Sequence, residues 1–173
     1  MARKFTAPVF VPANTLTYFD GPRPVAPTLA KAARIWPTFM DQPFDAVGAL
    51  RAAKGVKVAG YAMGTDMTWT GPRPQGGLAE GQAVPGAPGW TVIESPGHSD
   101  DSIALWNSAT GTLLSGDAVV TADGRAWHTP ETIDDRKAES TRRRLEQLPV
   151  SQLLPGHGRP VRSTGTVWET QRR

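Results

Sequence analysis

The chain contains no cysteine, and it has only three histidines. Without cysteine there are no disulfide bonds and no thiolate ligands, so any metal ion must be held by histidine and carboxylate side chains. The same absence is compatible with a reducing compartment, and we expect a cytoplasmic protein. No hydrophobic run approaches transmembrane length, and the residues after Met1-Ala2-Arg3-Lys4 lack the apolar stretch of a signal peptide.

A strong excess of one charge is also missing, because the net charge is only +3 at a calculated pI of about 9.6. The basic runs Arg142-Arg143-Arg144 and Arg172-Arg173 are short, and acidic residues alternate with the first of them. This pattern is typical of a solvated charged helix face, and it lacks the interleaved aromatics of a nucleic-acid surface. We expect no nucleic-acid or membrane partner. The sequence leaves the oligomeric state open, a dimer included.

Turn-forming residues are plentiful, with 18 glycines and 16 prolines, which predicts many short elements. A chain of 173 residues is the size of one domain, so residues 1–173 are taken as a single unit. Strands interspersed with helices in two halves favour an α/β (α+β) fold, an αββα sandwich. The expected strands are 9–11, 15–19, 56–61, 90–94, 102–106, 111–115 and 150–154, and the expected helices are 27–35, 46–55 and 131–148, with a long loop at 64–89.

Three short segments each place a metal-capable side chain beside a glycine at the end of an apolar run. They are Ser95-Pro96-Gly97-His98, Leu114-Ser115-Gly116-Asp117 and Leu153-Leu154-Pro155-Gly156-His157. Glycine lets the backbone turn sharply there and approach a shared centre. Because zinc-type sites collect such ligands from separate strand ends, the sequence predicts that these three side chains share a metal site. The alternatives are a loop or capping role for His98 and a turn-stabilising carboxylate for Asp117.

In this order and spacing, the segments resemble the C-terminal half of the metallo-β-lactamase superfamily, and they look closest to its glyoxalase-II-like branch. The resemblance covers roughly residues 15–162. It implies the αββα fold and metal-assisted hydrolysis of an ester, thioester or lactone. The N-terminal part looks short for the family, so we expect early strands to be reduced or absent.

The family's His-x-His-x-Asp-His motif has no complete counterpart in this chain. Aligned on Val47-Gly48-Ala49-Leu50, the matching stretch has Asp41, Pro43 and Ala46 at the three histidine positions. Only Asp45 agrees with the motif, and it also fits as the N-cap of the helix that follows. Asp41 is either an oxygen ligand in place of an imidazole or an exposed loop acid.

What the resemblance then implies is at most one divalent ion, held by Asp45, Asp117 and His157. Family members have a second ligand set made of three histidines, and His98, with Asp41 at a histidine position, would be what remains of that set here. Two carboxylates and one imidazole form a hard donor set, so Mn, Fe or Mg suit it as well as Zn.

Two further residues are candidates for contacting a small-molecule substrate. His128 follows Trp127 in an expected loop, and Trp69 lies in the long Gly/Pro-rich loop. An exposed loop residue and a loop anchor are the respective alternatives.

Two functions stay open, and with them whether the protein is an enzyme. One is a hydrolase with an impaired or single-metal site, in which Asp45 and Asp117 are the catalytic residues. The other is a non-catalytic pseudoenzyme that uses the fold for binding or assembly and needs no metal.

Overall fold

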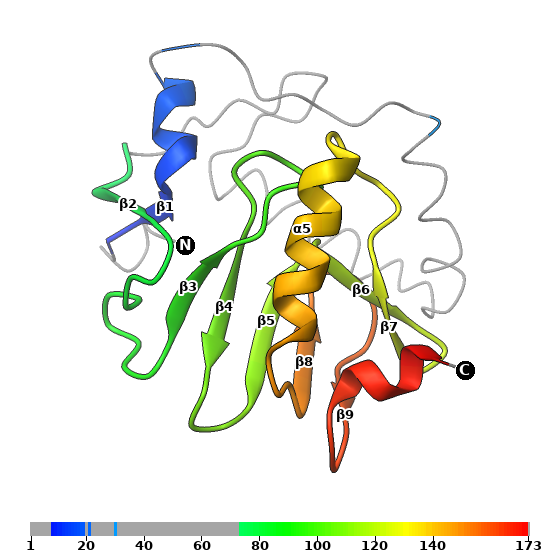
Figure 1. Ribbon diagram of the computed structural model, residues 1–173. Coiled ribbons are helices and arrows are strands. Elements are labelled where there is room, and N and C mark those ends of the chain that lie inside the picture. The colour runs from blue at the N-terminus through cyan, green and yellow to red at the C-terminus, as the bar shows by residue number, and fades with distance from the viewer. Residues whose placement is uncertain (1–7, 20, 22–29, 31–72, 173) are drawn as a thin grey trace, which may run out of the picture.

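The computed structural model describes residues 8–19, 21, 30 and 73–172. Its centre is a sheet built from β3 (Thr91–Glu94), β4 (Ile103–Asn107), β5 (Thr112–Gly116), β8 (Gln152–Pro155) and β9 (Val161–Arg162). These five strands lie side by side in the order β3-β4-β5-β8-β9 (Figure 1). β4 is antiparallel to both β3 and β5, whereas β5 and β8 are parallel. β3, β5 and β8 therefore run in one direction and end at the same edge of the sheet.

Helix α5 (Asp135–Glu146) covers one face of this sheet (Figure 1). The Asp134 side chain caps it by accepting hydrogen bonds from the Arg136 and Lys137 backbone N–H groups, so the helix begins later than predicted. Thr141 and Leu145 are its buried residues. The helix predicted over 131–148 is thus confirmed in its central part.

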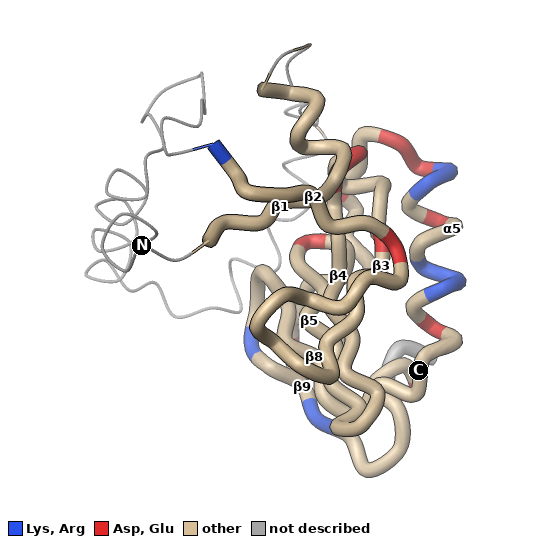
Figure 2. The backbone as a smooth tube through the Cα atoms, turned by 90° about the vertical axis from the view of Figure 1, so that its left-hand side faces the viewer, with Lys and Arg blue, Asp and Glu red and all other residues tan. Residues whose placement is uncertain are grey.

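Acidic and basic residues alternate along α5, as Figure 2 shows. The Arg142 guanidinium donates to the Glu139 and Glu146 carboxylates, and Arg143 donates to Glu139 as well. These hydrogen bonds, first that of Arg142, lower the pKa of Glu139 to about 2. The charged face expected for the Arg142-Arg143-Arg144 run is confirmed, and its arginines pair with acids, including Arg144 with Glu80 at 2.7 Å.

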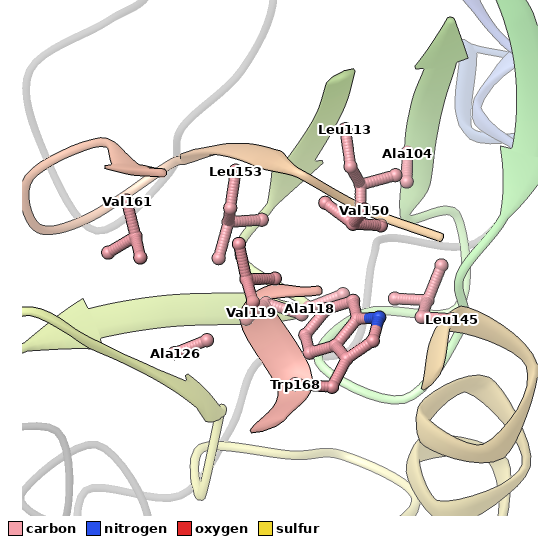
Figure 3. Packing of buried hydrophobic residues seen from close by; sticks show 11 residues of the cluster. Ala104, Leu113, Ala118, Val119, Ala126, Leu145, Val150, Leu153, Val161 and Trp168 are labelled. Atoms are coloured by element: carbon pink, nitrogen blue, oxygen red, sulfur yellow. The ribbon is translucent and has the colours of Figure 1, made fainter. Parts of the chain in front are cut away.

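The hydrophobic core lies between the sheet, α5 and the C-terminal 3₁₀ helix η3 (Val167–Arg172) (Figure 3). Leu113, Val150 and Leu153 are completely buried, and their side chains point toward Leu145 and Trp168. The indole N–H of Trp168 donates to the Leu148 carbonyl oxygen at 3.1 Å, so this large side chain is buried without losing its hydrogen bond. Full burial of a Leu or Val side chain contributes about 1.5–3 kcal/mol, so this cluster holds the layers together.

A hairpin that the sequence analysis did not predict follows the central sheet. It consists of β6 (Val119–Ala122) and β7 (Arg125–His128), joined by Asp123 and Gly124 with φ of 49° and 71°. Two consecutive positive φ values are what the tight two-residue turn of a hairpin requires. The expectation that His128 lies in a loop is therefore wrong, because His128 is the last residue of β7. An Asp-Gly pair between apolar segments was the available signal.

The N-terminal segment combines one confirmed prediction and one error. β1 (Phe10–Pro12) pairs in parallel with β2 (Gly76–Leu78), which confirms a short strand near residues 9–11. The strand predicted over 15–19 is instead part of the 3₁₀ helix η1 (Ala13–Phe19). β-propensity mainly reflects packing in a pleated sheet, and these side chains contact a distant loop instead.

The elements predicted over 27–35, 46–55 and 56–61 lie outside the described residues, apart from residue 30, which is helical. The predicted loop over 64–89 is described only from residue 73, and it contains β2. In the described part of the chain, no helix has the length and apolar character needed to cross a membrane.

Candidate metal centre

His98 lies in the loop that connects β3 to β4, and Gly97 fixes this loop on α5. The Gly97 carbonyl oxygen accepts hydrogen bonds from the backbone N–H groups of Ile133 and Asp134, at 2.7 and 3.2 Å. Gly97 has a φ of +141°, and a Cβ at this position would lie 2.5 Å from the Cα of Ala138. Only glycine satisfies both the backbone angle and this close approach, so the residue before His98 decides where the loop sits.

Asp117 and His157 come together through the glycines that precede them. The Gly156 N–H donates to the Gly116 carbonyl oxygen at 2.9 Å, just where the pairing of β5 with β8 shifts register. A Cβ on Gly156 would overlap Oδ1 of Asp117 and lie 3.0 Å from the carbonyl carbon of Gly116. The glycine-flanked pattern in the sequence therefore has the structural role that was expected of it.

The structure brings His98, Asp117 and His157 to one place at the edge of the sheet. His98 Nε2 lies 3.7 Å from Asp117 Oδ2, and His157 Nε2 lies 3.6 Å from Asp117 Oδ1. Both separations are too long for a hydrogen bond. They are close to the distance of about 3.4 Å that separates two ligands of one tetrahedral ion when each ligand is about 2.1 Å from it. Each imidazole–carboxylate pair, taken by itself, therefore has the spacing of two ligands of one divalent ion.

A hydrogen bond from the back of the ring orients His98 toward Asp117. His98 Nδ1 lies 2.8 Å from the Glu131 carbonyl oxygen. Because a carbonyl oxygen only accepts, Nδ1 carries a proton, and in the neutral ring Nε2, on the side of Asp117, is the nitrogen with the lone pair. Metal-binding histidines commonly have such a partner on the second nitrogen. The side chains are 20%, 34% and 42% exposed for His98, Asp117 and His157, so the centre opens toward solvent on the His157 side.

The two imidazoles face different oxygens of the Asp117 carboxylate. Among the described residues, no group of three or more His, Asp or Glu side chains is arranged around one common point. The geometry consists of two adjacent pairs, each with one imidazole nitrogen and one Asp117 oxygen. Asp41 and Asp45, predicted as further ligands, and Trp69, predicted at the substrate cleft, lie outside the described residues and stay predictions.

His128 lies close to this centre in a packed environment. Its ring stacks on Trp168, with centroids 5.7 Å apart, and its buried Nε2 lies 3.3 Å from Glu146 Oε1 without a hydrogen-bond geometry. Burial lowers the pKa of His128, and the Glu146 carboxylate acts in the opposite direction. His98 and His128 both line a small cavity of about 20 Å³. A substrate contact by His128 stays a prediction.

Sequence reasoning missed an acidic pair, Asp100 and Asp101, that directly follows the His98 turn. The Thr15 hydroxyl donates to Asp101 Oδ2 at 2.7 Å, and the Tyr18 hydroxyl donates to Asp100 Oδ1. Burial raises the pKa of Tyr18, and its hydrogen bond to Asp100 adds to the effect. The only sign of this pair's role in the sequence was its position beside a candidate ligand. Its partners Thr15 and Tyr18 could not be inferred, because they lie 86 and 82 positions earlier in the chain.

Comparison with known proteins relates this geometry to one family. The model of the metallo-beta-lactamase superfamily matches residues 44–157. The probable metallo-hydrolase YqjP of Bacillus subtilis (strain 168) is 31% identical over 99 residues, which cover 53% of this chain and 31% of that protein. Metallo-beta-lactamase domain-containing protein 1 of Homo sapiens is 32% identical over 89 residues, or 50% and 34% of the two chains. The chain thus spans about a third of the length of the curated relatives that it matches.

Solved structures show the same fold at lower identity. A metallo-beta-lactamase family protein from Thermus thermophilus superposes with a TM-score of 0.52 and 22% identity, covering 94% of this chain and 50% of that one. The structure of TTHA1623 in a di-iron-bound form gives a TM-score of 0.53 at 20% identity, covering 99% and 65%. With its α+β sandwich fold, the chain belongs to the metallo-β-lactamase superfamily.

Proposed function

We propose that this protein is a hydrolase-type member of the superfamily, near its glyoxalase-II-like branch, with an impaired centre for a single divalent ion. The observation that carries the proposal is the Asp117 carboxylate, which has an imidazole nitrogen 3.6–3.7 Å from each of its oxygens. Each nitrogen–oxygen separation is too long for a hydrogen bond, but it is close to the distance between two ligands of the same metal ion.

In this proposal Asp117 and His157 hold the ion together with Asp45, and His98 with Asp41 is the remnant of the other ligand set. A divalent ion bound here would act as a Lewis acid and provide a nucleophile at neutral pH. The carboxylate-rich set accepts Zn, Mn, Fe or Mg, and one structure of the same fold is described as di-iron-bound. The substrate class is a small ester, thioester or lactone.

The impairment rests on the N-terminal motif, where Asp41, Pro43 and Ala46 stand at family histidine positions. Each missing imidazole removes a strong nitrogen donor, and Pro43 also restricts the backbone at the place where a ligand would have to turn inward. The same three residues favour the second candidate function, a non-catalytic relative that binds or assembles through the fold.

Elemental analysis after dialysis against Zn²⁺ tests this proposal, and we expect at most one ion per chain. Two tightly held ions would contradict the single-ion site, and no ion under Zn²⁺ supplementation would favour the non-catalytic relative. Ala46→His should raise the affinity, because it restores an imidazole beside Asp45. Ala49→His, placed in the following segment, serves as the matched control and should leave the affinity unchanged.

Hydrolysis of β-lactam, thioester and lactone reporters tests the activity directly. We expect weak or undetectable turnover by the unmodified protein. The triple variant Asp41→His, Pro43→His and Ala46→His should hold more metal and hydrolyse at least one reporter faster. Robust turnover by the unmodified protein that a chelator abolishes would show that the centre is not impaired.

A further inference from the structure

The 3₁₀ helix η1 is held in place in an unusual way, because none of its residues is buried. A 3₁₀ helix of seven residues gains little from its own hydrogen bonds, whose geometry is poor, and it is seldom this long. Leu16 lies against Gly77 of β2, but no side chain of η1 is fully buried. Polar contacts to other parts of the molecule therefore contribute to its position.

Those contacts are polar, and they go to the loop that carries His98. Thr15 Oγ1 donates to Asp101 Oδ2 at 2.7 Å, the Tyr18 hydroxyl donates to Asp100 Oδ1, and Asn14 Nδ2 donates to the Asp100 carbonyl oxygen at 3.4 Å. Three side chains of one short helix thus converge on two consecutive residues of the loop.

Asp101 connects η1 to Ser99, the residue that follows His98, because its two carboxylate oxygens bind different partners. Its second oxygen, Oδ1, accepts a hydrogen bond from Ser99 Oγ at 2.7 Å. Ser102 Oγ lies 2.6 Å from Ser99 Oγ and accepts from the Ser99 N–H at 3.2 Å. Because the single hydroxyl proton of Ser99 goes to Asp101, Ser102 donates to Ser99, and the whole turn is closed around the Asp101 carboxylate.

We propose that η1 clamps the His98 loop, and that Thr15 and Asp101 are positioning residues for His98; the link to metal binding rests on the proposed function. The loop is fixed on α5 at one end, through Gly97, and on η1 at the other end, through Asp101. His98 lies between these two anchors. These two anchors, together with the hydrogen bond of Nδ1 to the Glu131 carbonyl oxygen, set the distance of its imidazole from Asp117.

A cavity of about 230 Å³ lies between η1 and the His98 loop, beside the anchor that Asp101 provides. Residues of η1 and of the His98 loop line it together, and Glu94 and Lys137 add charges to its wall. Side-chain packing therefore does not fill the space beside the loop. The hydrogen bonds of Thr15, Tyr18 and Asn14 are what connects the loop to η1 across this polar space.

The test compares Thr15→Val, which removes the hydroxyl at nearly constant size, with Thr15→Ser, which keeps it. Thr17→Val is the matched control, because Thr17 Oγ1 donates to the Asn14 carbonyl oxygen within η1 and does not contact the loop. Asp101→Asn is a second variant, since an amide has one acceptor oxygen for the two hydroxyl donors. Thermal midpoints check that all variants fold.

Two measurements are made on the full chain. Hydrogen–deuterium exchange of the metal-free protein should be at least about fivefold faster at the amides of residues 97–102 in Thr15→Val and Asp101→Asn, with the amides of β5 unchanged. Zn²⁺ affinity, from competition with a chromophoric chelator, should fall about tenfold in the same two variants. Thr15→Ser and Thr17→Val should behave like the unmodified protein.

Unchanged exchange in Thr15→Val and Asp101→Asn would overturn the clamp, and so would a Thr15→Ser variant as impaired as Thr15→Val. If Asp117→Ala abolishes Zn²⁺ binding while Thr15→Val retains full affinity, the proposed function stands and the positioning role fails. If the unmodified protein binds no Zn²⁺, the proposed function fails, and the exchange rates alone decide whether η1 holds the loop.

Discussion

His98 and His128 are exposed to almost the same extent, 20% and 18% of the side chain, yet their surroundings differ completely. His98 has a backbone carbonyl behind Nδ1 and a carboxylate at 3.7 Å from Nε2. His128 has an indole ring against its face and a carboxylate 3.3 Å from a buried Nε2. Exposure alone therefore does not distinguish a candidate ligand from a packing residue. The two kinds of histidine are distinguished by the groups that their ring nitrogens contact.

The comparison also separates two kinds of carboxylate. Asp117 lies between two imidazoles at a bulged strand end, beside glycines whose backbones approach it closely. Glu146 lies on a helix, where the Arg142 guanidinium also binds it at 2.9 Å. An arginine already compensates the charge of Glu146, whereas the groups that face the two oxygens of Asp117 are imidazoles. This difference favours Asp117 as the acceptor of a cation.

The largest effect should come from Asp117→Ala, which removes the carboxylate shared by the two imidazoles. We expect Zn²⁺ binding to be lost, a decrease of more than about 100-fold, because a direct ligand matters more than an outer-shell partner. Isothermal titration measures it. His128→Gln is the control and should bind Zn²⁺ normally. An equal loss of Zn²⁺ affinity in both variants would contradict the conclusion that Asp117, and not the surroundings of His128, binds the ion.

Gly97→Ala should strongly destabilise the His98 side. The new Cβ would meet the backbone of Ala138 at 2.5 Å, at a φ of +141° that side chains disfavour, and we expect a loss of about 3 kcal/mol in the free energy of unfolding. Urea denaturation measures it. Gly124→Ala, at a φ of +71° with nothing within 4 Å, should lose only about 1 kcal/mol. Similar losses would show that the close approach to α5 is not what requires glycine.

A smaller effect is expected for Gly156→Ala, whose Cβ would overlap Oδ1 of Asp117. The Asp117 side chain must then turn away from His157. We expect a loss of about 1–2 kcal/mol in stability and a weaker Zn²⁺ affinity, measured by urea denaturation and chelator competition. The part of the pH dependence of unfolding that we assign to His128 should not change. An unchanged Zn²⁺ affinity would contradict the proposal that Asp117 and His157 hold the ion together.

The smallest effect concerns His128 and pH. Burial places the folded-state pKa of His128 below its ordinary value of 6.5. Above this value the ring is neutral in both states and contributes nothing. As the pH falls below it, the unfolded chain binds a proton that the folded protein does not, so stability decreases by up to about 1.4 kcal/mol per pH unit until the folded-state pKa is reached.

His128→Gln should remove this part of the acid sensitivity, which urea denaturation at pH 7.5 and 5.5 measures. His98→Gln is a suitable comparison, because the two rings are equally exposed but differ in their partners. If His128→Gln were as acid-sensitive as the unmodified protein, the packed ring would not be the source of the effect.

Local pattern was sufficient wherever a feature depended on residues close in the chain. The strand and hairpin signals over 90–115 and the glycine beside each candidate ligand led to β3, β4, β5 and the edge they share. The same reasoning failed for residues 15–19. Thr15 and Tyr18 suit a strand by propensity, but their hydroxyls bind Asp100 and Asp101, 82–86 positions away. Propensity contains no information about such partners.

The sequence by itself determined the chemistry available to this protein. Without cysteine, only imidazoles and carboxylates are present as strong metal donors, and glycines stand beside three of them. Tertiary structure alone decided how these donors are arranged. It set one imidazole against each oxygen of Asp117, stacked His128 on Trp168, and placed η1 against the His98 loop. The physical reason is that side-chain types and turn geometry are local properties of a chain, whereas distances between segments depend on how the whole sheet, α5 and the termini pack together.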